Sequence, residues 1–320
     1  MREGAGRITG EGRMLLELRD TLKEIYMKYD TWLDAIGKFV LAFLSFQIVN
    51  MQLGQMQMLN NLLLVMVLSL ACSFLPLNTV ILVMAGIALV HSYAIGIPAL
   101  AVAAGVLMMV LLLYFGVAPE QALAFLLTPV ALEFQSMLAI PLIFGLLCGP
   151  KAGVGILFGN ISFFTLEEIG SYALTNQADQ SGLSEGELLL KGIQDLLRGI
   201  LGNSEMILSA IVMIAVLFIV YAVRRLAIKY AWQMAIGIGT VIYLILEIFG
   251  KMTFQVGFSY LPLLFGTVVS VLLAVVLQGL CFQLDYRRVE SLQFEDDDYY
   301  YYVKAVPKRK RERTVEEWKR

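Results

Sequence analysis

Residues 97–115 read IPALAVAAGVLMMVLLLYF, a run that contains no charged side chain. At a rise of about 1.5 Å per residue, such a helix comes close to crossing the roughly 30 Å hydrocarbon core of a bilayer. Apolar runs of similar length recur from about Ile36 to about Cys281. This repetition predicts an all-α fold, a polytopic bundle of transmembrane helices.

The composition of the whole chain agrees with this fold class. Hydrophobic residues make up 59% of the 320 residues and charged residues only 16%. A soluble domain needs more charges to cover its surface. The charges concentrate at the two ends of the chain and in loops. We therefore predict a cytoplasmic amphipathic segment at 1–35, a transmembrane domain at 36–281 and a cytoplasmic tail at 282–320.

The number of spans depends on how the middle of the chain is interpreted. The apolar runs give ten candidate spans, approximately residues 36–52, 61–77, 79–95, 97–115, 121–134, 137–149, 152–166, 206–223, 231–248 and 257–280. Taking 121–149 as a re-entrant pair of helices leaves eight spans and the same sidedness. We therefore expect eight to ten spans, with short broken helices in the middle.

Positive charges in short loops orient the bundle, because Lys and Arg are retained on the cytoplasmic side. Arg224, Arg225 and Lys229 lie between two candidate spans, and Lys151 lies in another short connection. Most of the charged residues in loop 167–205 are acidic instead, so this loop is expected to be external. This pattern predicts a multi-pass protein of the cell membrane with both termini cytoplasmic.

Residues 116–166 differ from the rest because prolines interrupt their apolar runs. Pro119, Pro129, Pro141 and Pro150 leave runs that, as helices, cover only about 20 Å. Broken or re-entrant helices occur at membrane depth where protein or a water-filled cavity satisfies the backbone, and transporters build substrate sites from them. Two interpretations stay open: a segment that lines a cavity, or several short, kinked and tightly packed spans.

Four ionisable residues in or near the membrane are candidate functional residues, because burying a charge there is costly. Glu133, the strongest candidate, follows an apolar run and lies either in a cavity or at the membrane interface. Glu247 is one helical turn from Lys251, and we expect a local pair near the external end. Lys151 and His91, the only histidine, are expected at the interface with access to water.

Motifs for known chemistry are missing from the sequence. It contains no nucleotide-binding, serine-hydrolase or zinc-protease motif. One histidine cannot form a multi-histidine metal site, and the three cysteines have no metal-ligand spacing. We therefore expect no cofactor and no metal. An enzyme would have to use carboxylates such as Glu133, Glu167 and Glu168.

Two segments outside the spans are amphipathic. Residues 184–202, SEGELLLKGIQDLLRGILG, place most of their leucine and isoleucine residues on one helical face. This favours a helix in the outer membrane interface, with docking on the spans as the alternative. Residues 13–39 have a similar pattern with balanced charges. We expect them to form a helix along the inner face that bends into the first span.

The tail combines a strand-forming segment with a basic run. Residues 294–313 read FEDDDYYYYVKAVPKRKRER. A lone strand is expected to be disordered or to add to the sheet edge of a cytoplasmic protein. The candidate partner-binding residues are Tyr299, Tyr300, Tyr301, Tyr302 and Val303. The basic residues expected to contact anionic lipid, rather than nucleic acid, are Lys308, Arg309, Lys310, Arg311 and Arg313.

The motif FEDDDYYYYVKAVPK, residues 294–308, resembles the C-termini of uncharacterised multi-pass membrane proteins from anaerobic Gram-positive bacteria. The resemblance is confined to this short part of the chain. It implies a membrane protein but brings no activity and no site residue.

Three functions follow as hypotheses. The first is a non-enzymatic membrane component of a larger assembly, whose tail docks a cytoplasmic partner. The second is a small-solute transporter or channel with a path through 116–166. The third is a membrane-embedded enzyme of envelope biosynthesis. A polar cavity that reaches the middle of the bundle would favour the second hypothesis.

Overall fold

The computed structural model describes the helical bundle and a short β-hairpin. The described residues are 10–175, 185–226, 228, 230–257, 259–281, 290–295 and 300–305. The helices are α1 (Gly10–Leu53), α2 (Leu62–Ser73), α3 (Leu77–Ile95), α4 (Ile97–Val117), the 3-10 helix η1 (Pro119–Gln121), α5 (Ala122–Glu133), α6 (Ala139–Leu147), α7 (Ala152–Thr175), α8 (Glu185–Gly202), α9 (Ser204–Arg224), α10 (Ala231–Phe254) and α11 (Tyr260–Cys281). The hairpin strands are β1 (Glu290–Glu295) and β2 (Tyr300–Ala305).

The predicted all-α polytopic bundle is confirmed. Within the described residues, seven helices are long and apolar enough to cross a membrane. The expected number was eight to ten. The difference arises because three of the ten candidate segments form helices that are too short, namely α2 with 12 residues, α5 with 12 and α6 with 9.

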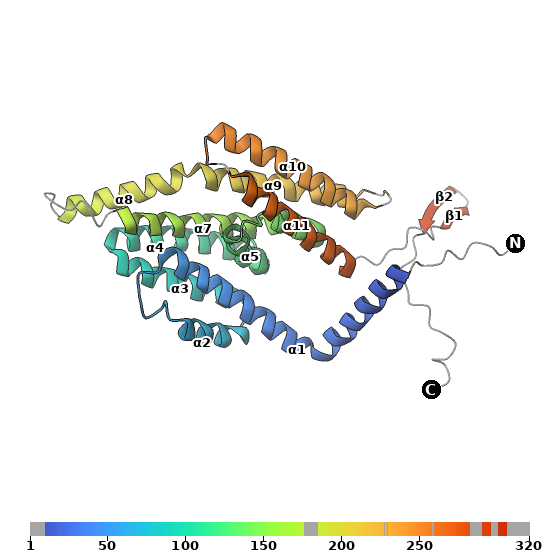
Figure 1. Ribbon diagram of the computed structural model, residues 1–320, viewed down its shortest axis with the longest axis horizontal. Coiled ribbons are helices and arrows are strands. Elements are labelled where there is room, and N and C mark those ends of the chain that lie inside the picture. Colours follow the sequence, from blue (N-terminus) through green and yellow to red (C-terminus); the bar gives the residue numbers. More distant parts are fainter. Residues whose placement is uncertain are drawn as a thin grey trace.

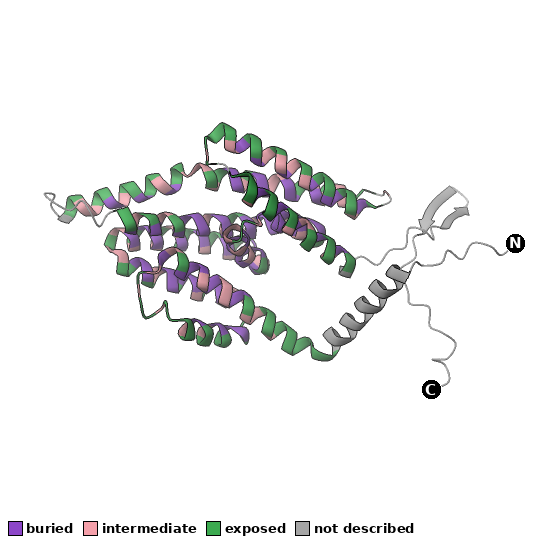
Figure 2. Ribbon diagram, in the orientation of Figure 1, coloured by how far each residue is buried: buried purple, intermediate pink, exposed green. Residues whose placement is uncertain are grey.

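The outer surface of the bundle is apolar, as a lipid-embedded protein requires. Figure 2 shows exposed residues along the outer sides of α2, α10 and α11, with buried residues on the faces turned to the interior. On α11, for example, Leu261 and Phe265 are 81% and 71% exposed. Large apolar side chains exposed along a whole helix favour contact with lipid over contact with water.

Most helices run along one direction between two ends of the bundle (Figure 1). We call one end the Arg224 end; it holds the last residue of α9 and the turn before α7. The other is the α8 end, where α7 finishes and α9 begins. At the Arg224 end, the Tyr114 hydroxyl donates hydrogen bonds to Asn78 Oδ1 and the Pro119 carbonyl, both at 2.9 Å.

Helices α5 and α6 form a re-entrant hairpin that enters from the Arg224 end. Gly155 of α7 packs on Gln121, and Gly159 packs on Phe125 and Thr128. The contacts advance in the same order on both helices, so α5 runs parallel to α7. With 12 residues against 24, α5 reaches only about half of the length of α7. Helix α6 then returns to the Arg224 end beside α9, where Gly145 packs on Val220.

A tight turn forms the tip of this hairpin. Gln135 has a positive φ of 53°, and the Ser136 N–H donates to the Ala131 carbonyl at 2.8 Å. The turn rests on α11, whose Gly266 lies directly against the Gln135 carbonyl, so a Cβ atom has no room there. Ser270 of α11 donates to the Ser136 carbonyl at 3.2 Å. The re-entrant interpretation of the proline-rich middle agrees with this geometry.

The two amphipathic segments are both helical. Helix α1 bends at Tyr29, which has non-helical backbone angles (φ −121°, ψ 24°), as expected for a helix that turns into the first span. Helix α8 packs against α4 and α7. Its Gly192 lies against Pro98 and Tyr172, and Leu196 and Ile200 are buried. The contacts therefore match the alternative of docking on the spans.

The tail strand is not isolated, which corrects that part of the prediction. Strand β2 pairs with β1 in an antiparallel hairpin whose register places Glu290 opposite Ala305 and Glu295 opposite Tyr300. Strand β1 was not predicted because the residues of Glu290–Glu295 have weak strand propensity. Tyr299 and the basic residues from Lys308 to Arg313 lie outside the described residues.

Candidate functional site: an acidic cavity

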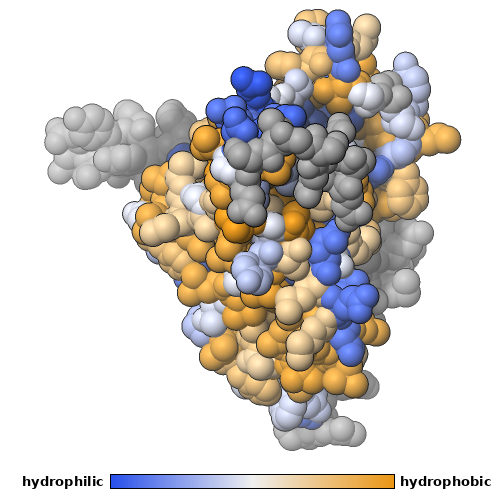
Figure 3. Space-filling view, turned by 90° about the vertical axis from the view of Figure 1, so that its left-hand side faces the viewer, coloured by the Kyte–Doolittle hydropathy of each residue, from blue (hydrophilic) through white to orange (hydrophobic). Residues whose placement is uncertain are grey.

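An acidic cavity of about 370 Å³ opens between the tip of the re-entrant hairpin and the α8 end of the bundle. Its lining comes from α5, α7, α9, α10 and α11, from the α5–α6 turn and from the α10–α11 connection. It consists of Leu132, Glu133, Gln135, Met137, Phe163, Phe164, Glu167, Glu205, Tyr243, Glu247, Lys251, Gly257, Ser259, Pro262 and Leu263. Figure 3 looks onto this end of the molecule, where hydrophilic residues interrupt a mostly hydrophobic surface.

Helix α10 supplies one wall through residues spaced four apart. Tyr243, Glu247 and Lys251 stack on one helical face because side chains at i and i+4 are neighbours. The facing residue, Glu205, is in the first turn of α9. Asn203 caps the start of that helix, because its side chain accepts a hydrogen bond from the Met206 N–H at 2.9 Å. A carboxylate in the first turn is stabilised by the helix dipole.

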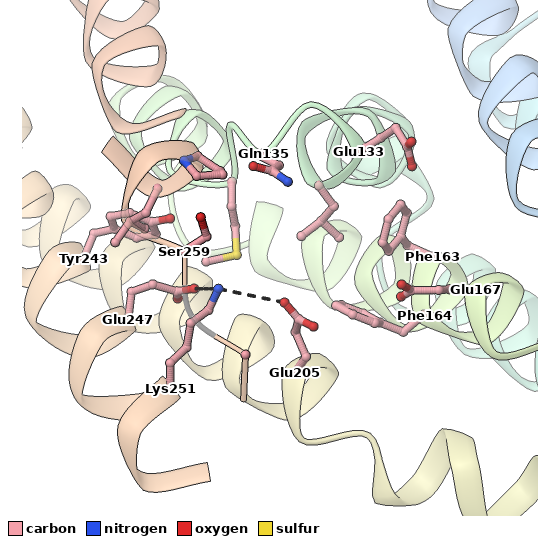
Figure 4. Close-up of a pocket in the computed structure, with 15 residues that line it drawn as sticks. Glu133, Gln135, Phe163, Phe164, Glu167, Glu205, Tyr243, Glu247, Lys251 and Ser259 are labelled. Carbon is pink, nitrogen blue, oxygen red and sulfur yellow. Dashed lines mark ion pairs between the residues drawn. The ribbon is translucent and has the colours of Figure 1, made fainter. Parts of the chain in front are cut away.

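Lys251 links two of the carboxylates. Its ammonium lies 3.2 Å from Glu247 Oε1 and 3.9 Å from Glu205 Oε1 (Figure 4). Glu247 is only 5% exposed, and its second oxygen, Oε2, is buried without a hydrogen-bond partner among the described residues. The pair therefore leaves one buried acceptor of Glu247, a residue of the cavity lining, without a partner among the described residues.

The other wall carries two carboxylates beside aromatic rings. Glu133 is the last residue of α5, at the tip of the hairpin, and Glu167 comes from α7. Phe163 and Phe164, also from α7, lie edge to face with ring centroids 5.3 Å apart. Within the described part of the chain, neither Glu133 nor Glu167 forms an ion pair.

The structure brings two of the four candidate residues together. Glu133 and Glu247 lie about 110 positions apart in the chain, yet both line the cavity. The expected local pair of Glu247 with Lys251 is present, although Glu247 is buried rather than interfacial. Lys151 is exposed in the turn before α7, away from the cavity.

The expectation for His91 is wrong, because its side chain is fully buried instead of reaching water. Its Nε2 lies 2.9 Å from Asn50 Oδ1, and its Nδ1 accepts the Met56 N–H at 3.2 Å. Asn50 in turn donates to the Leu59 carbonyl at 2.9 Å. His91 thus fastens the loop between α1 and α2 to α3, a structural role outside the cavity.

Glu205 and Tyr243 are site residues that the sequence did not predict, and Lys251 was expected only as a local partner of Glu247. The i, i+4 spacing of Tyr243, Glu247 and Lys251 indicates a polar face on an otherwise apolar helix. Glu205 carried no comparable signal, because it lies in an acidic loop with many other carboxylates.

The carboxylates are spread around the cavity rather than gathered at one point. No group of three His, Cys, Asp or Glu side chains in the described residues is placed to hold a metal ion. The volume lies within the range of about 300–1,000 Å³ that small-molecule sites occupy. The cavity can therefore attract and hold a positively charged organic solute.

The fold and this site define an integral, multi-pass membrane protein with an acidic cavity inside its helical bundle. No protein-family model matches the sequence, and no curated protein and no solved structure matches it either.

Proposed function

We propose that this protein carries a small cationic solute across the membrane, with the acidic cavity as its binding site and the re-entrant hairpin as its barrier. The observation that carries this proposal is Glu247, which lines a cavity that ends on the tip of the hairpin. Its carboxylate is buried, and one of its oxygens has no hydrogen-bond partner among the described residues. A carboxylate at membrane depth is costly, so its retention favours a functional role.

The charge of the cavity supports a cationic solute. The lining contains four carboxylates and one ammonium, so negative charge predominates. Acidic linings select cations in membrane pores, and low-dielectric walls strengthen the attraction. The same excess of negative charge would repel an anionic solute.

The packing of the re-entrant hairpin supports its proposed role as the barrier. Leu138, Leu142 and Leu146 lie between the hairpin tip and the Arg224 end and are fully buried, as a closed barrier requires. Arg224 fastens the return helix by donating to the carbonyls of Gly145 and Leu146 at the end of α6. Transport would require the hairpin to move against α9 and α11, a rearrangement of the kind found in transporters built from broken helices.

The distribution of basic residues supports an orientation for this path. Arg224 and Arg225 favour the cytoplasm for the Arg224 end, and the acidic segment around α8 favours the outside. The cavity then opens to the exterior of the cell membrane.

Helix α2, although short, returns the chain from the α8 end to the Arg224 end. Before it, Gln52 of α1 packs on Gly170 of α7 at the α8 end. After it, Asn78 of α3 contacts Tyr114 at the Arg224 end. The chain thus passes between the two ends an even number of times, and both termini lie in the cytoplasm.

Uptake into liposomes tests the proposal. Purified protein in liposomes of zwitterionic lipid is supplied with radiolabelled rubidium, tetramethylammonium or putrescine. We expect at least one of these cations to enter faster than in protein-free liposomes. Glu247→Gln should slow that uptake about tenfold, because a charge-assisted contact of about 1.5–3 kcal/mol is lost.

The matched control is Glu120→Gln, which removes the same charge from an exposed residue at the opposite end of the bundle. Its uptake should equal that of the unchanged protein. If none of the three cations enters faster than in protein-free liposomes, or if both variants slow uptake equally, the transport proposal fails.

A second proposal concerns the tail, which we propose docks a cytoplasmic protein. One edge of β2 is paired with β1, and its other edge has no strand beside it within the described residues. An isolated two-stranded hairpin is marginally stable, so addition to the exposed sheet edge of a partner would stabilise it. The basic residues that follow would hold the hairpin near anionic lipid.

Proline at Tyr301 tests the docking proposal, since proline removes a backbone donor and disturbs strand pairing. A true partner should be recovered with the unchanged protein and lost with Tyr301→Pro. The same partner should slow amide hydrogen exchange of Tyr300–Ala305. Equal recovery by both proteins, or unchanged exchange, would remove the hairpin as the docking site.

A further inference from the structure

The two walls of the cavity are chemically different, and this difference narrows the class of solute. One wall holds Glu247 and Glu205 with Lys251 between them; the other holds Glu133 and Glu167 beside two phenylalanines (Figure 4). Resting on the proposed function, we infer that the cavity binds an extended organic cation with two or more ammonium groups joined by alkyl chain, such as a linear polyamine.

The contacts of Lys251 show which kind of ligand group the first wall can bind. Its side chain is a primary ammonium on a flexible alkyl stem, and it reaches both Glu247 and Glu205. It uses only one oxygen of Glu247, and the buried Oε2 stays without a partner among the described residues. If the Glu247 side chain turns this oxygen toward the cavity, a second ammonium from a ligand can supply its missing donor while Lys251 keeps Oε1.

The second wall accepts a further ammonium and its alkyl chain. Glu133 and Glu167 provide negative charge without a cation of their own in the described residues. The neighbouring Phe163 and Phe164 offer apolar surface for methylene groups and ring faces for a cation. Tyr243 on the first wall adds another aromatic side chain.

The spread of these groups disfavours compact ions. A single metal ion requires several ligands converging on one point, and the described residues contain no such group of three. A cavity of about 370 Å³ also exceeds the volume of a small monovalent ion many times. A ligand with separated charges matches both walls at once, because each ammonium meets its own carboxylates.

Calorimetric titration tests the inference with the full chain in nanodiscs of zwitterionic lipid. The ligands are spermidine, methylamine and magnesium chloride, and protein-free nanodiscs provide the baseline. We expect spermidine to bind at least about tenfold more tightly than methylamine, since each further charged hydrogen bond contributes about a factor of ten. Magnesium should bind more weakly than spermidine.

Substitutions on each wall test whether one ligand reaches both. Glu133→Gln and Glu247→Gln should each weaken spermidine binding about tenfold, and Glu120→Gln should leave it unchanged. Methylamine, with one ammonium, should respond to only one of the two cavity variants. Sensitivity of spermidine to one wall alone would overturn the inference.

Failure of this inference is distinguishable from failure of the proposed function. If methylamine or magnesium binds as tightly as spermidine while rubidium or tetramethylammonium still enters liposomes, the polyamine inference is wrong and the transport proposal stands. If none of the three ligands binds and no cation enters, both are wrong.

Discussion

Replacing Lys251 with methionine should destabilise the folded protein by about 3–5 kcal/mol, because it leaves Glu247 as a buried charge without its partner. The Glu247 and Lys251 side chains are only 7% and 18% exposed, and their charged atoms are 3.2 Å apart. At an effective dielectric constant of about 20, attraction at this distance amounts to about 5 kcal/mol. Desolvation offsets part of this attraction in the intact pair, but the substitution removes the attraction and leaves the desolvation.

The second contact of Lys251 should contribute much less. Glu205 lies 3.9 Å away and its side chain is 52% exposed, so water screens the interaction. Glu205→Gln should therefore change the free energy of unfolding by less than about 1 kcal/mol. The comparison separates the buried contact from the exposed one at the same lysine.

Reversible unfolding in mixed micelles with increasing SDS, followed by circular dichroism, provides the free energies. The double variant Lys251→Met with Glu247→Gln should recover most of the stability lost in the single variant, because no buried charge is left unpaired. A Lys251→Met variant within about 1 kcal/mol of the unchanged protein, or a double variant no more stable than the single one, would refute the reasoning.

Three further predictions concern the fold. Gly266→Ala should displace the hairpin tip and lower the unfolding free energy by about 2 kcal/mol or more, whereas Gly279→Ala, with open space around it, should not. His91→Leu should lower the unfolding free energy by about 1–3 kcal/mol through its lost hydrogen bonds, and a matching rise in protease cleavage between α1 and α2 would show where the loss acts. In a background lacking the native cysteines, a cysteine at Asp179 should react with an impermeant thiol reagent in intact cells and one at Ser291 should not; the reverse labelling would contradict the orientation.

The sequence was sufficient to predict the features that depend on local pattern. Uninterrupted apolar runs predicted the long helices, and prolines with short runs marked 116–166 as the irregular middle. Pro129 lies inside α5 and Pro141 inside α6, in the two helices that fail to cross. The ambiguity between a re-entrant pair and two short spans could not be resolved from the sequence, because both produce the same apolar runs.

The sequence could not predict features that depend on which helix faces meet. Nothing in the hydrophobic pattern places Glu133 of α5 near Glu247 of α10, since both helices are apolar on most sides. The burial of His91 was unpredictable for the same reason, because its partner Asn50 lies 41 positions away. The pairing of β1 with β2 was not predicted because the sequence of β1 has weak strand propensity.

The cavity itself follows from the shortness of the hairpin helices. Helix α7 has 24 residues and α5 has 12, so α7 extends about 18 Å beyond the end of α5 at Glu133. A full-length apolar helix would have filled this space and sealed the bundle. Instead, the ends of α9 and α10 contribute Glu205 and Lys251, and the connection before α11 contributes Ser259. Buried polar groups need partners or water, so a cavity with this lining is hydrated or holds a ligand. The feature that keeps α5 and α6 from crossing the membrane is therefore also the one that creates the site.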